Sequence, residues 1–390
     1  MKLAIVIPGF QSDERDWCIP VFTNLARCLS RQVELHVFAL RYPQRRDYYR
    51  IGEVNVHSTG AGAFGDRRIW GLSLLKTWRD FEYDLSREHQ AAPFDAIMGI
   101  WATESGMLAT SIARKLGVPS LVHLAGGELV DMRQVLYGNY GRPFEGHFVR
   151  ASLRDADLIT APSGVLVRRL KRIRADMRKV RRWAPGVDTA MFSPGEAERP
   201  QRPFTFVTVA SLLPVKGHRM LIRAFSNLRG KVPDRPLRWL VVGGGRLRSA
   251  LVDTVGSIRR LKGYVDFLGE VSHDRLPELY RATDAFVLGS LHEAQCMALL
   301  EAMSCGVPWV GPPVGAAYDL ARLDTDETPT GVAFAARKPD LVGDALLRML
   351  QMDPDARSEW GAQARRRVLR DYELQEQTDR LVGLLRELTG

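Results

Sequence analysis

Short apolar runs alternate with amphipathic stretches along most of this 390-residue chain. Apolar runs of this length are typical of buried strands, and the amphipathic stretches between them are typical of helices, so the order predicts βαβ units around parallel sheets. The series has two parts. We expect strands at 3–7, 33–39, 96–100, 120–124 and 158–161, and then at 204–209, 239–242, 265–267, 285–288 and 309–310. The pattern therefore predicts an α/β protein with two doubly wound, Rossmann-like sheets.

The two series are separated by a segment, 185–203, in which prolines and glycines stand among polar residues. That composition is typical of a connection rather than of a helix or strand. We therefore expect one domain at 1–186 and a second at 187–371, facing each other across a cleft. The last segment, 372–390, carries Leu381, Leu384, Leu385 and Leu388 on one helical face, and we expect this helix to pack back on the first domain.

Composition limits where the protein acts and what it binds. The apolar run after Met1 is too short for a signal peptide, and no later run has the length of a membrane span. The four cysteines have neither zinc-site nor disulfide-framework spacing, so we expect a cytoplasmic protein. The net charge of +10 favours anionic partners such as phosphates or anionic lipid head groups.

The most informative segment is 288–311, where an expected strand leads through a loop with Glu293 to a helix that starts near Cys296 and carries Glu301. Free backbone N–H groups at a helix start, at the carboxyl edge of a parallel sheet, form a binding site for a diphosphate. The two carboxylates can accept hydrogen bonds from hydroxyl groups at both ends of one ligand. A sugar nucleotide has such hydroxyls on its sugar and on its ribose.

This segment resembles the E-x7-E region of the family 4 retaining glycosyltransferases of GT-B fold, and the likeness extends over nearly the whole chain. The resemblance implies transfer of a sugar from a UDP- or GDP-linked donor to an acceptor that the sequence does not identify. It assigns Glu293 to the donor sugar and Glu301 to the ribose. The loop amides at Ala294, Gln295, Cys296 and Met297 would hold the diphosphate. The family often has Glu-Gly-Phe-Gly where this chain has 293–296, which we expect to alter donor fit.

A second resemblance follows the first expected strand of the second domain, where Lys216 and Gly217 stand. A lysine here can neutralise the charge that develops on the departing nucleotide, so we expect Lys216, with Glu293, to serve catalysis. The family usually has an arginine where this chain has Ser211. Further expected donor contacts are Gly244 and Arg246 in a glycine turn, and Val271 beside the base.

In the first domain we expect the acceptor near the loops that follow the strands. The candidates are Gly9 and Gln11 after the opening strand, Arg67 and Arg68 in a glycine-rich loop, and His123 and Glu128 around the 120–124 strand. The family tends to place a histidine before glycine at the position that Ala125 occupies here. A buried strand histidine is the alternative for His123.

Other interpretations remain open at this stage. The segment Gly60 to Gly65 matches the G-x-G-x-x-G fingerprint, so an NAD-dependent oxidoreductase is one alternative, although the fingerprint is not in the first βα turn. A non-catalytic sugar-nucleotide-binding protein is another. Two Asp-x-Asp segments, 155–157 and 324–326, do not follow suitable strands, and we expect transfer without a metal or another cofactor.

A basic amphipathic stretch covers 166–182. It suits peripheral contact with the anionic inner face of a membrane, or simply a solvated face above a packed helix. No recognised module or aromatic stacking pattern supports nucleic-acid binding.

Overall fold

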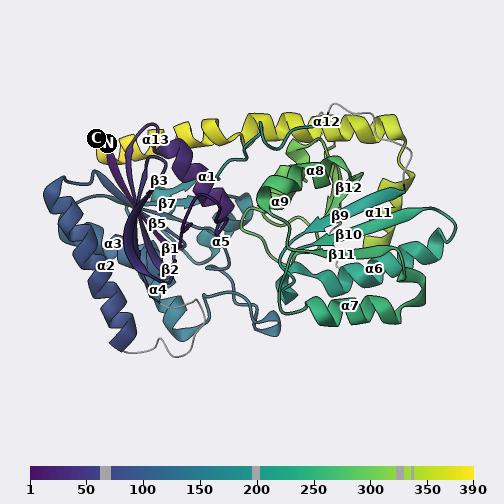
Figure 1. Ribbon diagram of the computed structural model, residues 1–390, viewed down its shortest axis with the longest axis horizontal. Helices are drawn as coiled ribbons and strands as arrows, with labels where there is room; N and C mark the ends of the chain where they lie inside the picture. Colours follow the sequence, from purple (N-terminus) through teal and green to yellow (C-terminus); the bar gives the residue numbers. More distant parts are fainter. Residues whose placement is uncertain (62–71, 196–202, 322–328, 335–337) are drawn as a thin grey trace. The chain divides into compact units, whose positions relative to one another are not determined.

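A computed structural model describes residues 1–61, 72–195, 203–321, 329–334 and 338–390 (Figure 1). The chain divides into two compact units. The first unit contains residues 1–186 and the C-terminal residues 374–390, and the second contains residues 187–373. Gly186 and Val187, in the proline- and glycine-rich segment, mark the division.

The first unit is built on an eight-stranded sheet in the order β3-β4-β2-β1-β5-β6-β7-β8. All neighbouring pairs are parallel except β3 and β4. The strands are β1 (Lys2–Gly9), β2 (Glu34–Tyr42), β3 (Arg46–Ile51), β4 (Val54–Thr59), β5 (Ala96–Ile100), β6 (Ser120–His123), β7 (Leu158–Ala161) and β8 (Val180–Arg182).

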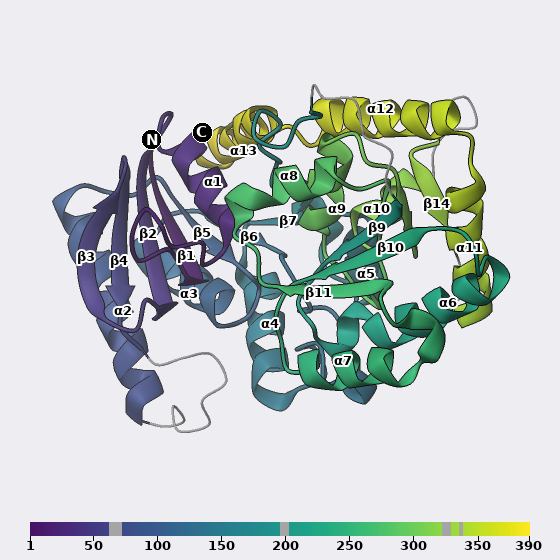
Figure 2. The same ribbon diagram turned by 45° about the vertical axis from the view of Figure 1, so that its right-hand side comes forward.

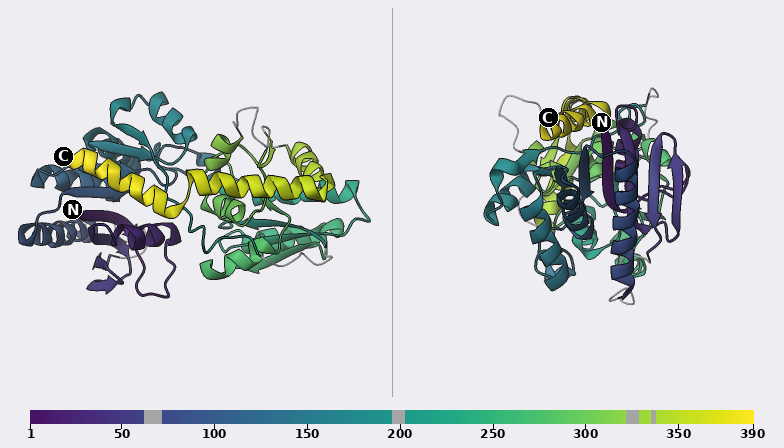
Figure 3. Two further views of the ribbon diagram at one scale, coloured as in Figure 1. Left: turned by 90° about the horizontal axis from the view of Figure 1, so that it is seen from above. Right: turned by 90° about the vertical axis from the view of Figure 1, so that its left-hand side faces the viewer.

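Helices cover both faces of this sheet, because alternate strand residues point to opposite faces and both sets are apolar. On one face, Leu3, Ile5 and Ile7 of β1 pack with helices α1 (Pro20–Leu29) and α13 (Leu374–Thr389), which lie side by side (Figures 1 and 3). On the other face, Ala4 and Val6 pack with α2 (Leu72–Ala91) and α3 (Glu104–Leu116). Helices α4 (Pro143–Asp155) and α5 (Gly164–Arg172) complete the unit.

The second unit has a six-stranded, wholly parallel sheet in the order β11-β10-β9-β12-β13-β14. Numbered within the unit, this is the order 3-2-1-4-5-6 of a dinucleotide-binding fold. The order reverses between β9 and β12. The strands are β9 (Phe204–Val209), β10 (Leu237–Val242), β11 (Val265–Gly269), β12 (Ala285–Val287), β13 (Trp309–Gly311) and β14 (Gly331–Ala333).

Right-handed crossovers in opposite directions from β9 and β12 put helices on opposite faces of this second sheet. Helix α6 (His218–Lys231) shares a core with α7 (Arg248–Ser257) and α11 (Pro339–Gln351). Helix α9 (Met297–Ser304) packs with α8 (Leu276–Arg281) and α12 (Pro354–Asp371), as Figure 2 shows. A short helix, α10 (Ala316–Leu320), precedes β14. The prediction of two doubly wound α/β sheets is confirmed.

Candidate functional site

The candidate site lies at the carboxyl edge of the second sheet, at the point where the strand order reverses. Open α/β sheets bind ligands at such points, since the loops that follow the two neighbouring strands diverge there. Here those loops are 210–216 after β9 and 288–296 after β12. A hydrogen bond from the Leu291 backbone N–H to the Val215 carbonyl, 2.7 Å, joins them.

Lys216 and Glu293, which are 77 residues apart in sequence, form an ion pair at this edge. The Lys216 Nζ lies 2.7 Å from the Glu293 Oε1, and both side chains are largely buried. Burial lowers the pKa of Lys216, but attraction to Glu293 more than offsets it, so the pKa is raised and the lysine stays charged. The Ser290 hydroxyl donates a second hydrogen bond to Glu293 Oε1. The structure thus brings both predicted catalytic residues together.

Gly217 allows the two loops to approach. Its φ is +72°, a conformation that glycine adopts at little cost, and it caps the start of α6. A Cβ at this position would lie 2.0 Å from the carbonyl oxygen of Gly289 in the loop after β12. Any larger residue would therefore push the two loops apart, together with Lys216 and Glu293.

Helix α9 begins directly after Glu293's loop and points its amino end at the same edge. Its N-cap residue, Cys296, makes no side-chain capping bond and has a φ of +82°, which is uncommon outside glycine. Burial raises the pKa of its thiol, so Cys296 is not a reactive thiolate. A small pocket of about 70 Å³ reaches from Ala210 and Lys216 to Glu293 and Met297. Positive charge from Lys216 and the α9 amino end thus converges on one small space.

Glu301 is buried inside α9, and both of its oxygens have partners. Oε1 lies 2.9 Å from His273 Nε2, and Oε2 accepts a hydrogen bond from the Tyr280 hydroxyl at 3.3 Å. The predicted contact with ribose hydroxyls would therefore share or replace these bonds. His273 begins a short 3-10 helix after β11, and Tyr280 lies in α8. The contacts of Glu301 therefore connect α9 to both of these elements.

The other expected donor residues lie on loops at the same edge. Ser211 follows β9, Gly244 and Arg246 follow β10, and Val271 follows β11. Backbone hydrogen bonds from Leu212 to the Gly244 carbonyl, 2.6 Å, and from Gly243 to Gly269, 2.7 Å, link these loops in order. Ser211 and Arg246 are exposed.

In the first unit, Gly9 and Gln11 lie where β1 ends, at that sheet's own reversal of strand order. Gln11 is 1% exposed, and its amide nitrogen Nε2 has no hydrogen-bond partner. Glu128 is buried and accepts hydrogen bonds from the backbone N–H groups of Ala125 and Gly126, at 2.9 and 2.7 Å. Its carboxylate thus holds the loop after β6.

His123 lies inside strand β6 and is 1% exposed. Its Nδ1 is 3.0 Å from the Thr160 hydroxyl, and its ring packs edge-on against Trp183. Burial lowers its pKa to about 3, so it is neutral. This geometry matches the alternative of a buried strand histidine and gives no support to a contact with the acceptor. Arg67 and Arg68 lie outside the described residues.

Sequence reasoning missed several residues that shape the second unit's edge. Ser290 contacts the carboxylate of Glu293. His273 and Tyr280 contact that of Glu301. Gly315, with a φ of +54°, lies so close to the Glu293 loop that a Cβ on it would be 2.5 Å from the Gln295 carbonyl oxygen. The run Gly-Pro-Pro-Val-Gly after the 309–310 strand was the available signal, since it marks one more strand-end loop at this edge.

The competing motifs do not form sites among the described residues. Most of the Gly60 to Gly65 fingerprint, like the Asp-x-Asp segment 324–326, lies outside them. Asp155 ends α4 and pairs with Arg154, while Asp157 accepts hydrogen bonds from the Ser120 backbone N–H and hydroxyl. In the parts of the chain that the structure describes, no helix is long and apolar enough to cross a membrane.

Comparison with family models gives two matches that follow one another along the chain. Residues 192–367 match "Glycosyl transferases group 1", and residues 19–186 match "Glycosyl transferase 4-like domain". Among curated relatives, D-inositol 3-phosphate glycosyltransferase from Rhodococcus opacus is 33% identical over 36% of this chain and 34% of its own length. The Salinispora arenicola protein of that name is 28% identical over 63% of this chain and 59% of its own. The chain thus spans about a third to three fifths of these relatives.

Solved structures match over the full length. Sucrose-phosphate synthase from Thermosynechococcus elongatus aligns with a TM-score of 0.78 at 18% identity, covering 100% of this chain and 99% of its own. Anabaena HepE in complex with UDP-glucose aligns with a TM-score of 0.74 at 15% identity, covering 100% of both chains. At this identity the structural likeness establishes the fold. The two consecutive family matches together cover most of the chain and show that it belongs to the group 1, GT4-type glycosyltransferases, which here have the GT-B fold.

Proposed function

We propose that this protein transfers a sugar from a nucleoside-diphosphate sugar to a hydroxyl acceptor, with retention of anomeric configuration. The observation that carries the proposal is the Lys216–Glu293 ion pair beside the amino end of α9, at the strand-order reversal of the second sheet. Solved structures of similar fold support this donor class, since HepE is described in complex with UDP-glucose and a trehalose-6-phosphate protein with UDP-2-fluoro glucose.

The chemistry assigned to each group follows from its charge. The diphosphate would lie against Lys216 and the backbone N–H groups of 294–297, which offset the negative charge of the leaving nucleotide. Glu293 would accept hydrogen bonds from sugar hydroxyls and orient the sugar, since it is held by Lys216 and Ser290 rather than free to attack. Because these groups supply the positive charge, we propose transfer without a metal or another cofactor.

The acceptor is proposed to bind the first unit near the end of β1, where the buried Gln11 amide has unused donors. The curated relatives are named for D-inositol 3-phosphate, so a phosphorylated polyol is the first acceptor to test. Simple alcohols and glycan acceptors would follow. Comparing UDP-linked with GDP-linked donors determines which nucleotide the protein prefers.

The test is release of nucleoside diphosphate from UDP-glucose, UDP-galactose, UDP-N-acetylglucosamine and GDP-mannose, with acceptors added in turn. Release that depends on an acceptor, and falls at least about 100-fold in Glu293→Gln, is the expected result. Donor binding without transfer for any acceptor would favour a non-catalytic sugar-nucleotide binder. Full activity in Glu293→Gln would refute the assigned site.

We further propose that the protein acts on the cytoplasmic side and contacts anionic membrane through α5 and the segment after it. Leu166 and Leu170 are buried in the unit, whereas Arg168, Lys171 and Arg172 are exposed. The contact would therefore be electrostatic rather than inserted. Vesicles containing phosphatidylserine should co-sediment the protein at low salt and release it at high salt, and neutral vesicles should not bind it. Equal recovery with both vesicle types would contradict the contact.

A further inference from the structure

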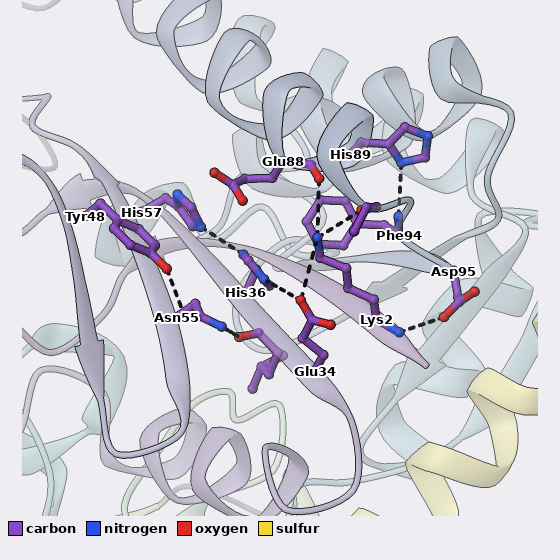
Figure 4. A network of polar contacts seen from close by, with 12 residues as sticks. Lys2, Glu34, His36, Tyr48, Asn55, His57, Glu88, His89, Phe94 and Asp95 are labelled. Atoms are coloured by element: carbon purple, nitrogen blue, oxygen red, sulfur yellow. Dashed lines mark hydrogen bonds and ion pairs between the residues drawn. The ribbon is translucent and has the colours of Figure 1, made fainter.

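A second cluster of chemically active side chains lies in the first unit, on two of its strands and on helix α2 rather than in the loops at the carboxyl edge of the sheet. His36 of β2 and His57 of β4 occupy neighbouring parallel strands. Both point to the face that α2 covers, where Glu88 approaches from the last turns of that helix (Figure 4). His36 is 4% exposed and His57 is 3% exposed.

The potential ligand atoms of these three residues converge. His36 Nδ1 and His57 Nε2 are 2.9 Å apart, and one ligand atom from each histidine and one Glu88 carboxylate oxygen all lie within 4.8 Å of one another. Two imidazole nitrogens on one tetrahedral zinc ion, each at about 2.0–2.1 Å from it, lie only slightly farther apart than this histidine pair. Shifts of about one ångström would bring the three atoms into one coordination sphere.

Glu34 orients His36 for such a role. Its Oε1 lies 3.2 Å from His36 Nε2, on the side of the ring away from His57 (Figure 4). If Nε2 carries the proton and donates it to Glu34, the lone pair of Nδ1 faces His57 and Glu88. A carboxylate behind a histidine is the usual outer partner of a metal-binding imidazole, because it fixes the ring and raises its basicity.

The surrounding charges are balanced rather than strongly negative. Lys2 Nζ lies 3.7 Å from Glu34 and also donates to two backbone carbonyls, at Glu88 and Ala92. Arg87 pairs with Glu88 at 3.1 Å, and its side chain is 55% exposed. An incoming cation would displace this exposed arginine from Glu88, and an exposed ion pair is worth about 1 kcal/mol or less. It would also replace the hydrogen bond between His36 Nδ1 and His57 Nε2, with the His57 proton moving to Nδ1.

We propose that His36, His57 and Glu88 form a binding site for a divalent transition metal, with Zn²⁺ the preferred ion and water completing the coordination. Two imidazoles and one carboxylate suit Zn²⁺ and exclude Mg²⁺ and Ca²⁺, which prefer oxygen ligands only. Bound at this place, the ion would tie α2 to strands β2 and β4. It would be separate from sugar transfer, for which we expect no metal.

The test uses untagged, chelator-treated full-length protein at pH 7.5, titrated with Co²⁺ and followed by the visible absorption of four-coordinate cobalt. One equivalent of Co²⁺ per chain, displaced by Zn²⁺, is expected. His57→Gln and Glu88→Gln should each lower the affinity at least about 100-fold, and Glu34→Gln about 10- to 100-fold. The Glu88 side chain is 22% exposed, compared with 3% for His57, so we expect the Glu88 variant to fold even if a change at His57 does not.

Matched controls separate this site from adventitious binding. His147 is an exposed histidine of α4, and Glu82 is a carboxylate of α2 that pairs with Lys115. His147→Ala and Glu82→Gln should bind Co²⁺ as the unchanged protein does. Zn²⁺ should also raise the unfolding temperature of the unchanged protein but not that of Glu88→Gln. Absence of stoichiometric binding, or binding that survives both ligand substitutions, would overturn the proposal and leave a histidine pair joined only by a hydrogen bond.

Discussion

Replacing Lys216 by methionine separates its proposed catalytic role from its role in the fold. Methionine keeps most of the unbranched apolar stem of the side chain but removes the charged Nζ that lies 2.7 Å from Glu293 Oε1. A unit charge about 4 Å from a phosphate contributes about 4 kcal/mol at an effective dielectric constant of about 20. Allowing for partial compensation by the α9 amino end, we expect kcat to fall about 100- to 1000-fold, as for loss of one donor to a developing charge.

The same substitution has a separate structural cost. Among the residues that the structure describes, Glu293 would keep the Ser290 hydroxyl as its side-chain partner. It would remain largely buried, which should destabilise the second unit by about 1–3 kcal/mol. The double variant Lys216→Met/Glu293→Gln removes both charges and should recover much of that stability but none of the activity. Lys262→Met, at an exposed lysine of the same unit, is the matched control.

Both effects are measurable with one set of four proteins. Steady-state release of nucleoside diphosphate gives kcat and KM, and urea denaturation gives stability. Stability that returns in the double variant while activity stays lost would separate the two roles of the pair. If Lys216→Met retained activity within about threefold of the unchanged protein and of Lys262→Met, the reasoning that assigns leaving-group stabilisation to this lysine would be wrong.

Three further outcomes are expected. Gly217→Ala should weaken donor binding and lower the free energy of unfolding by at least about 1–2 kcal/mol, because the φ of Gly217 is +72° and the new Cβ would lie 2.0 Å from a carbonyl oxygen. Calorimetry measures the donor binding and urea denaturation measures the stability. If neither changed, the close approach of the two loops would be refuted. Burial lowers the pKa of His123 to about 3 and of His218 to about 4, so both folded units hold a neutral histidine that the unfolded chain protonates below about pH 6.5. Stability is therefore complete above that pH and falls as the pH drops, by about 2 kcal/mol for each histidine at pH 5, and denaturation midpoints equal at pH 7.5 and 5 would contradict this. Glu128→Gln keeps one side-chain oxygen that accepts from a backbone N–H and replaces the other oxygen with an NH₂ group, which cannot accept. It should therefore lower stability by about 1–3 kcal/mol in the same urea measurement, and no loss would show that the carboxylate does not hold its loop.

Much of the fold could be predicted because its central strands are apolar on both faces. The runs at 3–7 and 204–209 are recognisable for that reason, and each is the first strand of its unit and lies between two parallel neighbours. Strand β3 was not predicted, because its sequence, Arg-Asp-Tyr-Tyr-Arg-Ile, lies at a sheet edge and is mostly exposed. Strands β8 and β14 were not predicted either. They are as short as β12 and β13, but they are partly exposed, whereas β12 and β13 are buried throughout and could be recognised as apolar runs.

The candidate site was predictable only where a motif and a strand end coincide. Glu293 and Lys216 each follow an apolar strand, so their common edge could be inferred from the parallel topology. The partners of Glu301 could not, since His273 is 28 residues away and meets it only after α8 and α9 have packed. The positive φ of Cys296 could not be predicted either, because it is a property of the folded backbone that no residue pattern indicates.

Calorimetric titration with UDP, GDP and NAD tests the proposed donor site most directly. We expect one of the two nucleoside diphosphates to bind one equivalent per chain with a dissociation constant on the order of micromolar. Lys216→Met should weaken that binding at least about 10-fold, and Lys262→Met should leave it unchanged. Binding of NAD alone, or nucleoside-diphosphate binding that is indifferent to Lys216→Met, would contradict the assignment of this edge as the donor site.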